Sequence, residues 1–298
     1  MIAIVVLYSG AANAQDKSTH IQSSNEFALD LNLIKRSAEK GYSSAQFQLG
    51  TLYRDGTGLK RDLKKARFWF EKSADQDYIP AQIRLGLMYK KGLGGEKHIK
   101  KAHYWFKRAA ALGDVEALVY LGDLISEFQH LDIFGPSASD YYLAAAKRDH
   151  TGAQNKIGTI LLNGTEGDKN YLDAVYWLRL AAMSGNTDAM NSLGIMNLKG
   201  MGIPKDTDKA IQWTVEAAKR SHPAAFYNLG LMYQLGLGLP KNSVFAYLWF
   251  DIAATLGHPK AKRFREGVAL SMNASQLKLS RALVNDCIRK DYLNCISF

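Results

Sequence analysis

Residues 45–58 read Ala-Gln-Phe-Gln-Leu-Gly-Thr-Leu-Tyr-Arg-Asp-Gly-Thr-Gly, and this stretch returns along the chain at a fixed spacing of 36 residues. Its opening Ala-x-x-x-(Leu or Ile)-Gly recurs without an insertion at Ala81/Gly86, Ala117/Gly122, Ala153/Gly158, Ala189/Gly194 and Ala225/Gly230. An aromatic column runs in phase with it through Trp69, Trp105, Tyr141, Trp177, Trp213 and Trp249. A chain of 298 residues would suggest about two domains by length alone, but a fixed period indicates one repeat array.

Each repeat is predicted to be a pair of helices. In the first repeat, Ala45, Leu49 and Tyr53 fall on one face of a helix over about residues 43–55. Gly56 is expected to end that helix, because glycine adopts the left-handed conformation that caps a helix end. Short polar residues that accept backbone N–H groups are expected to begin the second helix at Asp62, Asn170, Asp206 and Asn242.

The repeated glycine has a packing explanation. A glycine inside a helix costs about 1 kcal/mol relative to alanine, so its presence in successive repeats indicates a close helix crossing. The tryptophan column is expected to supply most of the apolar burial, and truncation of a buried tryptophan costs roughly 3–5 kcal/mol. Since one helix pair cannot cover its own apolar face, the pairs must stack on their neighbours.

The sequence A-x-x-x-L-G-x-x-Y-x-x-G-x-G, followed by an aspartate and then A-x-x-W, resembles the Sel1-like repeat over about residues 28–262. The resemblance implies an all-α fold, a right-handed α-α superhelical solenoid of helix pairs related to tetratricopeptide repeats. It also implies an adaptor or scaffold, because the known roles of such proteins are mainly of that kind. Exported bacterial members assemble envelope complexes, regulate signalling or contact host proteins.

The first residues are predicted to be a targeting segment. An apolar run from Met1 to Leu7 precedes Ala12-Asn13-Ala14, which resembles a signal-peptide cleavage site. The alternative to a signal peptide is a disordered apolar tail. The predicted organisation is a signal peptide (1–14), a linker (15–27), a truncated leading helix (28–42), six repeats with a degenerate seventh first helix (43–271), and a capping helix with a cysteine-containing tail (272–298). The expected location is therefore the periplasm or the exterior of a bacterium, with no integral membrane segment after cleavage.

A partner-binding groove is expected on the face of the first helices opposite to the core. At about 100° per residue this face falls on the columns of residues 47, 51 and 54. The candidate groove residues are Phe47, Arg54, Ile83, Leu87, Lys90, Asn155, Asn191, Ile195, Tyr227, Leu231 and Gln234. Asn155 and Asn191 occupy equivalent places and suit the backbone of an extended peptide. The alternative is that these side chains simply pack on adjacent first helices.

The third repeat departs from the pattern after Gly122, and its first helix is expected to run on or to end irregularly near Gly135-Pro136. Four apolar side chains in this segment are candidates for a partner-specific loop: Phe128, Leu131, Ile133 and Phe134. The alternative is sequence drift, with these side chains packed onto the neighbouring repeat.

The sequence offers little support for catalysis. Ser37-Ala-Glu-Lys40 matches the S-x-x-K of penicillin-binding enzymes, but the S-D-N and K-T-G partners are missing. His150, His222 and His258 share one column, where capping or exposure explains them better than zinc, because packed neighbours would hold them about 10 Å apart. Neither a cofactor nor a metal is expected.

The charge and the cysteines narrow the range of partners. The 38 basic and 28 acidic residues give a net charge of +10, which suits a solvated surface or peripheral contact with an acidic envelope polymer or lipid. Nucleic acid is disfavoured, because no recognition motif is present. Cys287 and Cys295 are predicted to form a disulfide if the chain turns between them, with free thiols or an intermolecular link as alternatives.

The sequence as a whole predicts a non-enzymatic scaffold of the bacterial cell envelope that binds a protein or peptide along a concave groove. Three alternatives stay open: a secreted host-interaction factor, a periplasmic regulator of signalling or motility, and a β-lactam-binding enzyme of the Sel1-like class.

Overall fold

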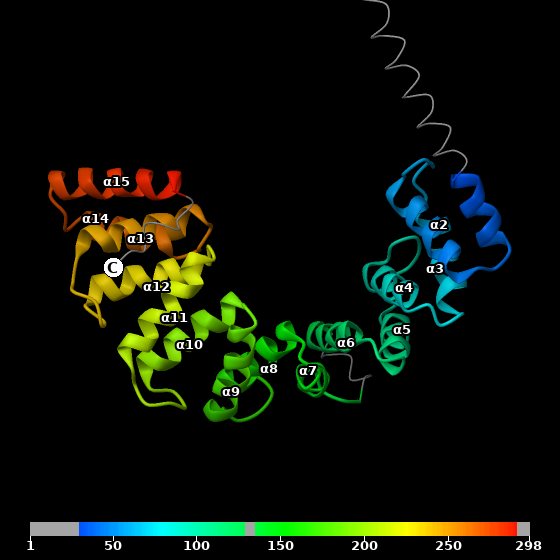
Figure 1. Cartoon of the computed structure of the whole chain (residues 1–298), viewed down its shortest axis with the longest axis horizontal. Helices are drawn as coiled ribbons and strands as arrows, with labels where there is room; N and C mark the ends of the chain where they lie inside the picture. The colour runs from blue at the N-terminus through cyan, green and yellow to red at the C-terminus, as the bar shows by residue number, and fades with distance from the viewer. Residues whose placement is uncertain (1–29, 129–134, 291–298) are drawn as a thin grey trace, which may run out of the picture. The chain divides into compact units, whose positions relative to one another are not determined.

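The computed structural model describes residues 30–128 and 135–290, and all regular secondary structure in these ranges is helical (Figure 1). The predicted all-α fold class is confirmed. The chain divides into two compact units, which meet in sequence at Ala138 and Ser139.

The N-terminal unit contains a helical segment over residues 30–39 and five further helices. These are α2 (Ser43–Asp55), α3 (Leu63–Ala74), α4 (Ile79–Lys91), α5 (Ile99–Ala111) and α6 (Val115–Glu127). Each helix from α2 to α5 packs against its successor within the unit. The even-numbered helices are the first helices of their repeats and are called A helices below; their partners are called B helices.

The C-terminal unit continues the same order. Its helices are α7 (Ala138–Ala146, whose first residue closes the N-terminal unit), α8 (Thr151–Asn163), α9 (Tyr171–Met183), α10 (Thr187–Lys199), α11 (Thr207–Lys219), α12 (Pro223–Leu235), α13 (Ser243–Thr255), α14 (Ala261–Ala269) and α15 (Ala274–Arg289). Each helix from α8 to α13 packs against its successor, and α13 also contacts α15. Both units are therefore stacks of helix pairs, as in a helical solenoid.

The local signals in the sequence place the helix ends. Helix α2 has the predicted bounds, and Gly56 ends it in the left-handed conformation with φ 77°. Asp62 accepts a hydrogen bond from the Lys65 backbone N–H at 3.0 Å and so begins α3. The other three predicted caps, Asn170, Asp206 and Asn242, begin their B helices in the same way. The caps were predictable because they depend only on residues within one turn.

The repeated glycine of the A helix lies against a buried side chain of the B helix. A Cβ added to Gly86 would lie 2.5 Å from the ring of Phe106, and one added to Gly230 would lie 2.6 Å from Phe250. The same close approach joins Gly50 to Phe70, Gly158 to Leu178 and Gly194 to Thr214. The predicted close crossing is confirmed, and below we call the B-helix residue opposite each glycine the plug.

The plug corrects the role expected of the tryptophans. Each plug directly follows a residue of the tryptophan column, and Phe70, Phe106 and Phe250 are completely buried. Only two tryptophans are buried, Trp105 and Trp249, whereas Trp69, Trp177 and Trp213 are half-buried. Adjacent residues on a helix point about 100° apart, so only one of the two can face the glycine.

The third repeat also differs from its prediction. Helix α6 does not run on towards Gly135 but ends at Glu127 after 13 residues, like the A helices on either side. Phe128 ends it with φ −120° in place of a left-handed glycine. Packing of α6 in its own unit therefore preserves the helix length without the glycine signal.

The last helix begins at a capping box in which Asn273 and Gln276 each accept from the other's backbone N–H. Helix α15 packs on α13, and the buried side chains it contributes include Val284 and Cys287. The disulfide between Cys287 and Cys295 stays a prediction, because Cys295 lies outside the described residues.

We expect Gly86→Ala to lower the free energy of unfolding by about 1–2 kcal/mol, because the new Cβ overlaps a ring that has no room to retreat. Gly267→Ala in α14 is the matched control, since nothing lies within 4 Å of that Cβ. The control should stabilise by up to about 1 kcal/mol through helix propensity alone. Urea unfolding followed by circular dichroism measures both, and effects of equal sign would contradict the close crossing.

We expect Phe106→Ala to cost roughly 3–5 kcal/mol, because it empties a completely buried site. Trp69→Ala should cost clearly less, since the indole is half-buried. The same unfolding measurement compares them. A larger loss for Trp69 would restore the tryptophan column as the main source of burial.

Candidate functional site

The eleven predicted groove residues share one structural property. All of them lie on A helices, and each side chain is half-buried, neither in the core nor fully in solvent. We call them the A-helix row. Five members of the row lie in the N-terminal unit and six in the C-terminal unit.

In the N-terminal unit the charged members of the row are already paired. Arg54 donates two hydrogen bonds to the Asp55 carboxylate at 2.7 and 2.8 Å, and these bonds lower the pKa of Asp55. Lys90 forms an ion pair with Glu127 at 2.6 Å. Phe47 lies between the rings of Phe70 and Tyr78. Ile83 and Leu87 are the half-buried apolar members of the row in this unit.

In the C-terminal unit two pockets open on the row. The polar pocket has a volume of about 560 Å³ and is lined by Asn155, Thr159, Asp188, Asn191, Ser192, His222, Pro223, Ala224, Gly257, His258 and Pro259. The apolar pocket has a volume of about 230 Å³ and is lined by Gly194, Ile195, Leu198, Lys199, Thr214, Asn228, Leu231, Met232 and Leu237. The structure thus brings Asn155 with Asn191, and Ile195 with Leu231, into two neighbouring sites on α8, α10 and α12.

Amide side chains join and line these pockets. Asn228 Nδ2 donates to Asn191 Oδ1 at 2.7 Å, so one residue of each pocket bonds to one of the other. Asn155 Oδ1 is buried and has no hydrogen-bond partner in the described part of the chain, and Gln234 Oε1 is in the same state. A buried acceptor without a donor is costly, so a ligand N–H at Asn155 would be stabilised.

The column of histidines divides into two roles. His150 Nδ1 and His222 Nδ1 accept from the N–H groups of Ala153 and Ala225, which confirms capping for these two. His258 does not cap a helix, because Lys260 stands at the N-terminal cap of α14.

His258 instead stacks on Tyr227, with ring centroids 4.3 Å apart, and its Nδ1 is buried without a partner in the described chain. Burial, with the nearby charges of Lys260 and His222, lowers the pKa of His258. Tyr227 also contacts Phe250 and Phe264, so it supports the pocket wall.

The segment proposed as a partner-specific loop is described only at its start. Phe128 is 8% exposed, and Lys97 Nζ lies 4.6 Å from the centroid of its ring. Phe128 therefore packs in its own unit, as the alternative interpretation expected. Leu131, Ile133 and Phe134 lie outside the described residues.

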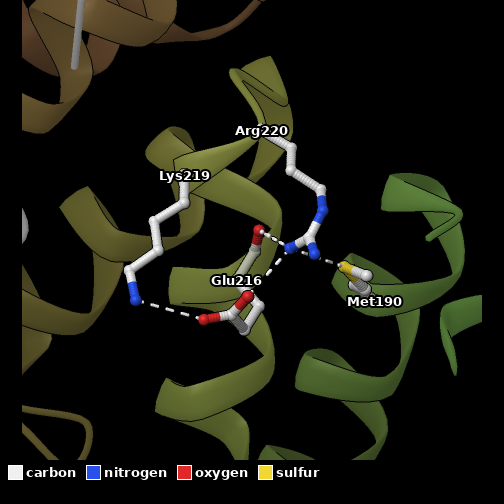
Figure 2. Close-up of polar contacts among 4 residues, drawn as sticks. All are labelled: Met190, Glu216, Lys219 and Arg220. Atoms are coloured by element: carbon white, nitrogen blue, oxygen red, sulfur yellow. Dashed lines mark hydrogen bonds and ion pairs between the residues drawn. The ribbon is translucent and has the colours of Figure 1, made fainter. Parts of the chain in front are cut away.

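Some of the basic surface is locally neutralised. The Glu216 carboxylate on α11 forms ion pairs with Lys219 Nζ at 3.1 Å and with Arg220 Nη1 at 2.8 Å. Arg220 also donates to the sulfur of Met190 on α10 (Figure 2). The hydrogen bonds from Arg220 and Lys219 lower the pKa of Glu216. Such pairs weaken the case that the whole basic surface binds an anionic partner.

The S-x-x-K motif lies at the end of the first described helical segment. Ser37 lies in the helical segment over residues 30–39, and Lys40 follows its end with an exposed side chain. Across residues 30–128 and 135–290, no cluster of three His, Cys, Asp or Glu side chains is arranged to hold a metal ion. Within the same ranges, none of the helices combines the length and apolarity needed to cross a membrane.

Sequence reasoning missed Thr214, Asn228 and the stacked His258. Thr214 carried a readable signal, because the equivalent position holds Phe70, Phe106 or Phe250 in other repeats. The hydrogen bond between Asn191 and Asn228 had no such signal in the sequence, because the two residues are 37 positions apart.

The lowered pKa of His258 predicts a pH effect. The folded state favours the neutral ring, whereas the unfolded chain protonates it near pH 6.5. The free energy of unfolding should therefore fall as the pH drops below about 6.5. His258→Gln should flatten this fall, and Lys260→Gln should flatten it partly. Thermal melts between pH 7.5 and 5 measure it, and identical slopes for the wild type and His258→Gln would refute the assignment.

Comparison with known proteins places the repeats. The Sel1 repeat family model matches residues 43–78, 79–114, 151–186, 187–222 and 223–258, and passes over the departing third repeat. A Sel1 repeat protein from Oxalobacter formigenes is 29% identical, with 86% of this chain and 80% of that chain covered and a TM-score of 0.66. The protein c5321, described as a protective antigen present in uropathogenic Escherichia coli strains, is 26% identical, with 87% and 64% covered and a TM-score of 0.53. No curated protein matches the sequence.

Sel1 repeats are typical of protein–protein interaction and are generally a non-catalytic fold. The predicted resemblance is confirmed, since the five matched repeats span more than half of the sequence. The chain belongs to the Sel1 repeat family.

Proposed function

We propose that this chain is a non-enzymatic scaffold of the bacterial cell envelope, which binds a protein or peptide along its A-helix row. The observation that carries the proposal is the presence of two adjoining pockets on α8, α10 and α12, lined by row residues.

The chemistry of the row suits a polypeptide. A half-buried apolar side chain such as Ile195 or Leu231 has surface left to bury, and each Å² is worth about 25 cal/mol. Asparagine amides offer both donors and acceptors, which match the N–H and C=O groups of a peptide backbone. An idle solvated face would carry mainly charged side chains instead.

The proposed envelope location rests on the N-terminal sequence. The apolar run and Ala12-Asn13-Ala14 support export with cleavage before Gln15, so the mature protein would begin at that residue. Basic side chains that are not paired on the surface would then meet acidic envelope polymers or lipid headgroups.

A second candidate function is a host-facing role. It is favoured by the similarity to c5321, the protein described as a protective antigen in uropathogenic strains. Recovery of the chain from the culture medium or cell surface would favour this role, and recovery from the periplasm would favour the internal scaffold.

We expect Asn155→Ala/Asn191→Ala/Leu231→Ala to lose its partner with the fold intact. Tyr227 is left unchanged, because its ring packs on three others and its removal would test stability instead. The matched control carries alanine at Leu172, Met183 and Leu270, which are 72%, 81% and 91% exposed. Crosslinking in the native host, followed by purification and mass spectrometry, measures partner recovery.

A partner recovered equally with the row variant would refute binding along the row. Loss only in the control would move the binding face to the exposed apolar side chains of Leu172 and Met183 on α9 and of Leu270 after α14. Circular dichroism and the melting temperature check that each variant is folded.

A further inference from the structure

One repeat lacks the aromatic or bulky aliphatic plug that fills the others. The plug column contains Phe70, Phe106, Tyr142, Leu178, Thr214 and Phe250. Thr214 is the smallest of the six, and its hydroxyl donates to the Ala210 carbonyl at 2.7 Å. The hydroxyl is therefore satisfied within its own helix and needs no further partner.

The neighbouring repeat shows what the missing ring would contact. The ring centroid of Phe250 lies 5.5 Å from that of Tyr227, on the A helix of the same repeat. It lies equally far, 5.5 Å, from that of Phe264, on the A helix that follows. The positions equivalent to these two around Thr214 are Asn191 and Asn228. These residues bond to each other at 2.7 Å, so an amide pair stands where the next repeat has aromatic contacts.

The helices have not closed over the missing ring. A Cβ on Gly194 would lie 3.3 Å from the Ala210 carbonyl oxygen, and a Cβ on Gly50, opposite Phe70, would lie 3.2 Å from the equivalent Ala66 carbonyl oxygen, so the backbones cross equally close with and without the ring. At the other end of the pair, Arg220, the residue that directly follows α11, bonds to Glu216 and reaches the sulfur of Met190 on α10 (Figure 2). The spacing of α10 and α11 is therefore maintained, and the space of the ring is left as the apolar pocket.

The pocket is large enough for a side chain. Gly194 and Thr214 both line it, together with Ile195, Leu231 and Met232. Its volume is about 230 Å³, whereas an engineered apolar cavity of about 150 Å³ binds benzene. A phenylalanine or leucine side chain from outside would bury most of its apolar surface there.

The rim indicates what accompanies that side chain. The bond between the two side chains uses Asn228 Nδ2 and Asn191 Oδ1. Asn191 Nδ2 can then donate to a peptide C=O, and Asn228 Oδ1 can accept from a peptide N–H. Lys199, whose side chain is exposed, also lines the pocket. The net charge of +10 further favours an acidic partner.

We propose that the apolar pocket binds one phenylalanine- or leucine-sized side chain of an extended, acidic partner peptide, inserted where other repeats hold their own ring. Asn191 and Asn228 bond the peptide backbone beside it, and Lys199 pairs with a neighbouring carboxylate. The inference rests on the proposed function, because it names the ligand of the same row.

The test uses the full chain and a phage-displayed library of random 12-residue peptides as the probe. Peptides enriched on the wild type are synthesised and titrated by calorimetry. Thr214→Phe fills the pocket with the ring of the other repeats, and Thr214→Leu fills it with the side chain that Leu178 places against Gly158. Thr255→Phe is the matched control, since Thr255 is exposed on α13 and its hydroxyl also bonds its own helix.

We expect enriched peptides that combine a bulky apolar residue with acidic ones. Thr214→Phe and Thr214→Leu should weaken their binding at least ten-fold while raising the melting temperature, and Thr255→Phe should leave it unchanged. Replacing the apolar peptide residue by alanine should weaken binding to the wild type by a similar factor. Lys199→Gln should weaken it less, and high salt should remove that difference.

Three outcomes would overturn the proposal, and they are distinguishable. Peptides that bind the wild type and both filled variants equally would show that the pocket is not used, although peptide binding by the scaffold would stand. A library without any enriched peptide would count against both the pocket and the proposed function. Binding that ignores the apolar residue but needs the acidic ones would replace the pocket by a surface electrostatic contact.

Discussion

The contact between a glycine of the A helix and the plug of the B helix sets the spacing within the repeats. In five repeats, a Cβ added to the glycine would overlap the plug. The backbone of the A helix therefore lies directly against a side chain of the B helix. Each glycine costs about 1 kcal/mol of helix propensity, and the buried plug offsets it where the plug is a phenylalanine. The spacing is thus fixed by the backbone, whereas the filling is decided by one side chain.

This separation explains how a uniform fold acquires a local site. If bulky side chains set the helix spacing, a smaller residue would let the helices approach and close the gap. Glycine already brings α10 and α11 as close as their backbones allow. The helices therefore cannot move closer to fill the space beside the small Thr214, and that space stays open as the apolar pocket. Interiors pack at the density of organic crystals, so an open apolar space among otherwise filled repeats is a feature that needs an explanation.

Much of the fold was predictable because its signals are local or periodic. The bounds of α2, the left-handed Gly56 and the cap at Asp62 each depend on residues within one or two turns. The burial expected of the tryptophans holds for Trp105 and Trp249 but not for Trp69, Trp177 and Trp213, because it depends on packing between helices. Trp69 and Phe70 are neighbouring aromatic residues on one helix, and it is Phe70 that lies against Gly50 and is completely buried.

The site was less predictable, because it depends on residues from different repeats. The row itself follows from helical geometry, and its residues are half-buried as a set. Its chemistry does not, since Asn191 meets Asn228 and Tyr227 meets His258 only when neighbouring repeats stack. Such contacts involve the surface between repeats, which no single repeat contains.

A repeat array makes its own reference for such exceptions. Tyr227, Phe250 and Phe264 form aromatic contacts in the last repeat, whereas the equivalent trios one and two repeats earlier are Asn191, Thr214 and Asn228, and Asn155, Leu178 and Ser192. Asn191, Thr214 and Asn228 of one trio and Asn155 and Ser192 of the other line the two pockets, whereas Leu178 and the aromatic trio do not. The repeats with aromatic plugs stabilise the stack. The two successive repeats with Leu178 and Thr214 as plugs have open pockets and hydrogen-bonding side chains in place of aromatic contacts. In the proposed function, recognition therefore uses repeats other than those that stabilise the stack, a separation that a repeat array allows because each repeat contacts only its neighbours.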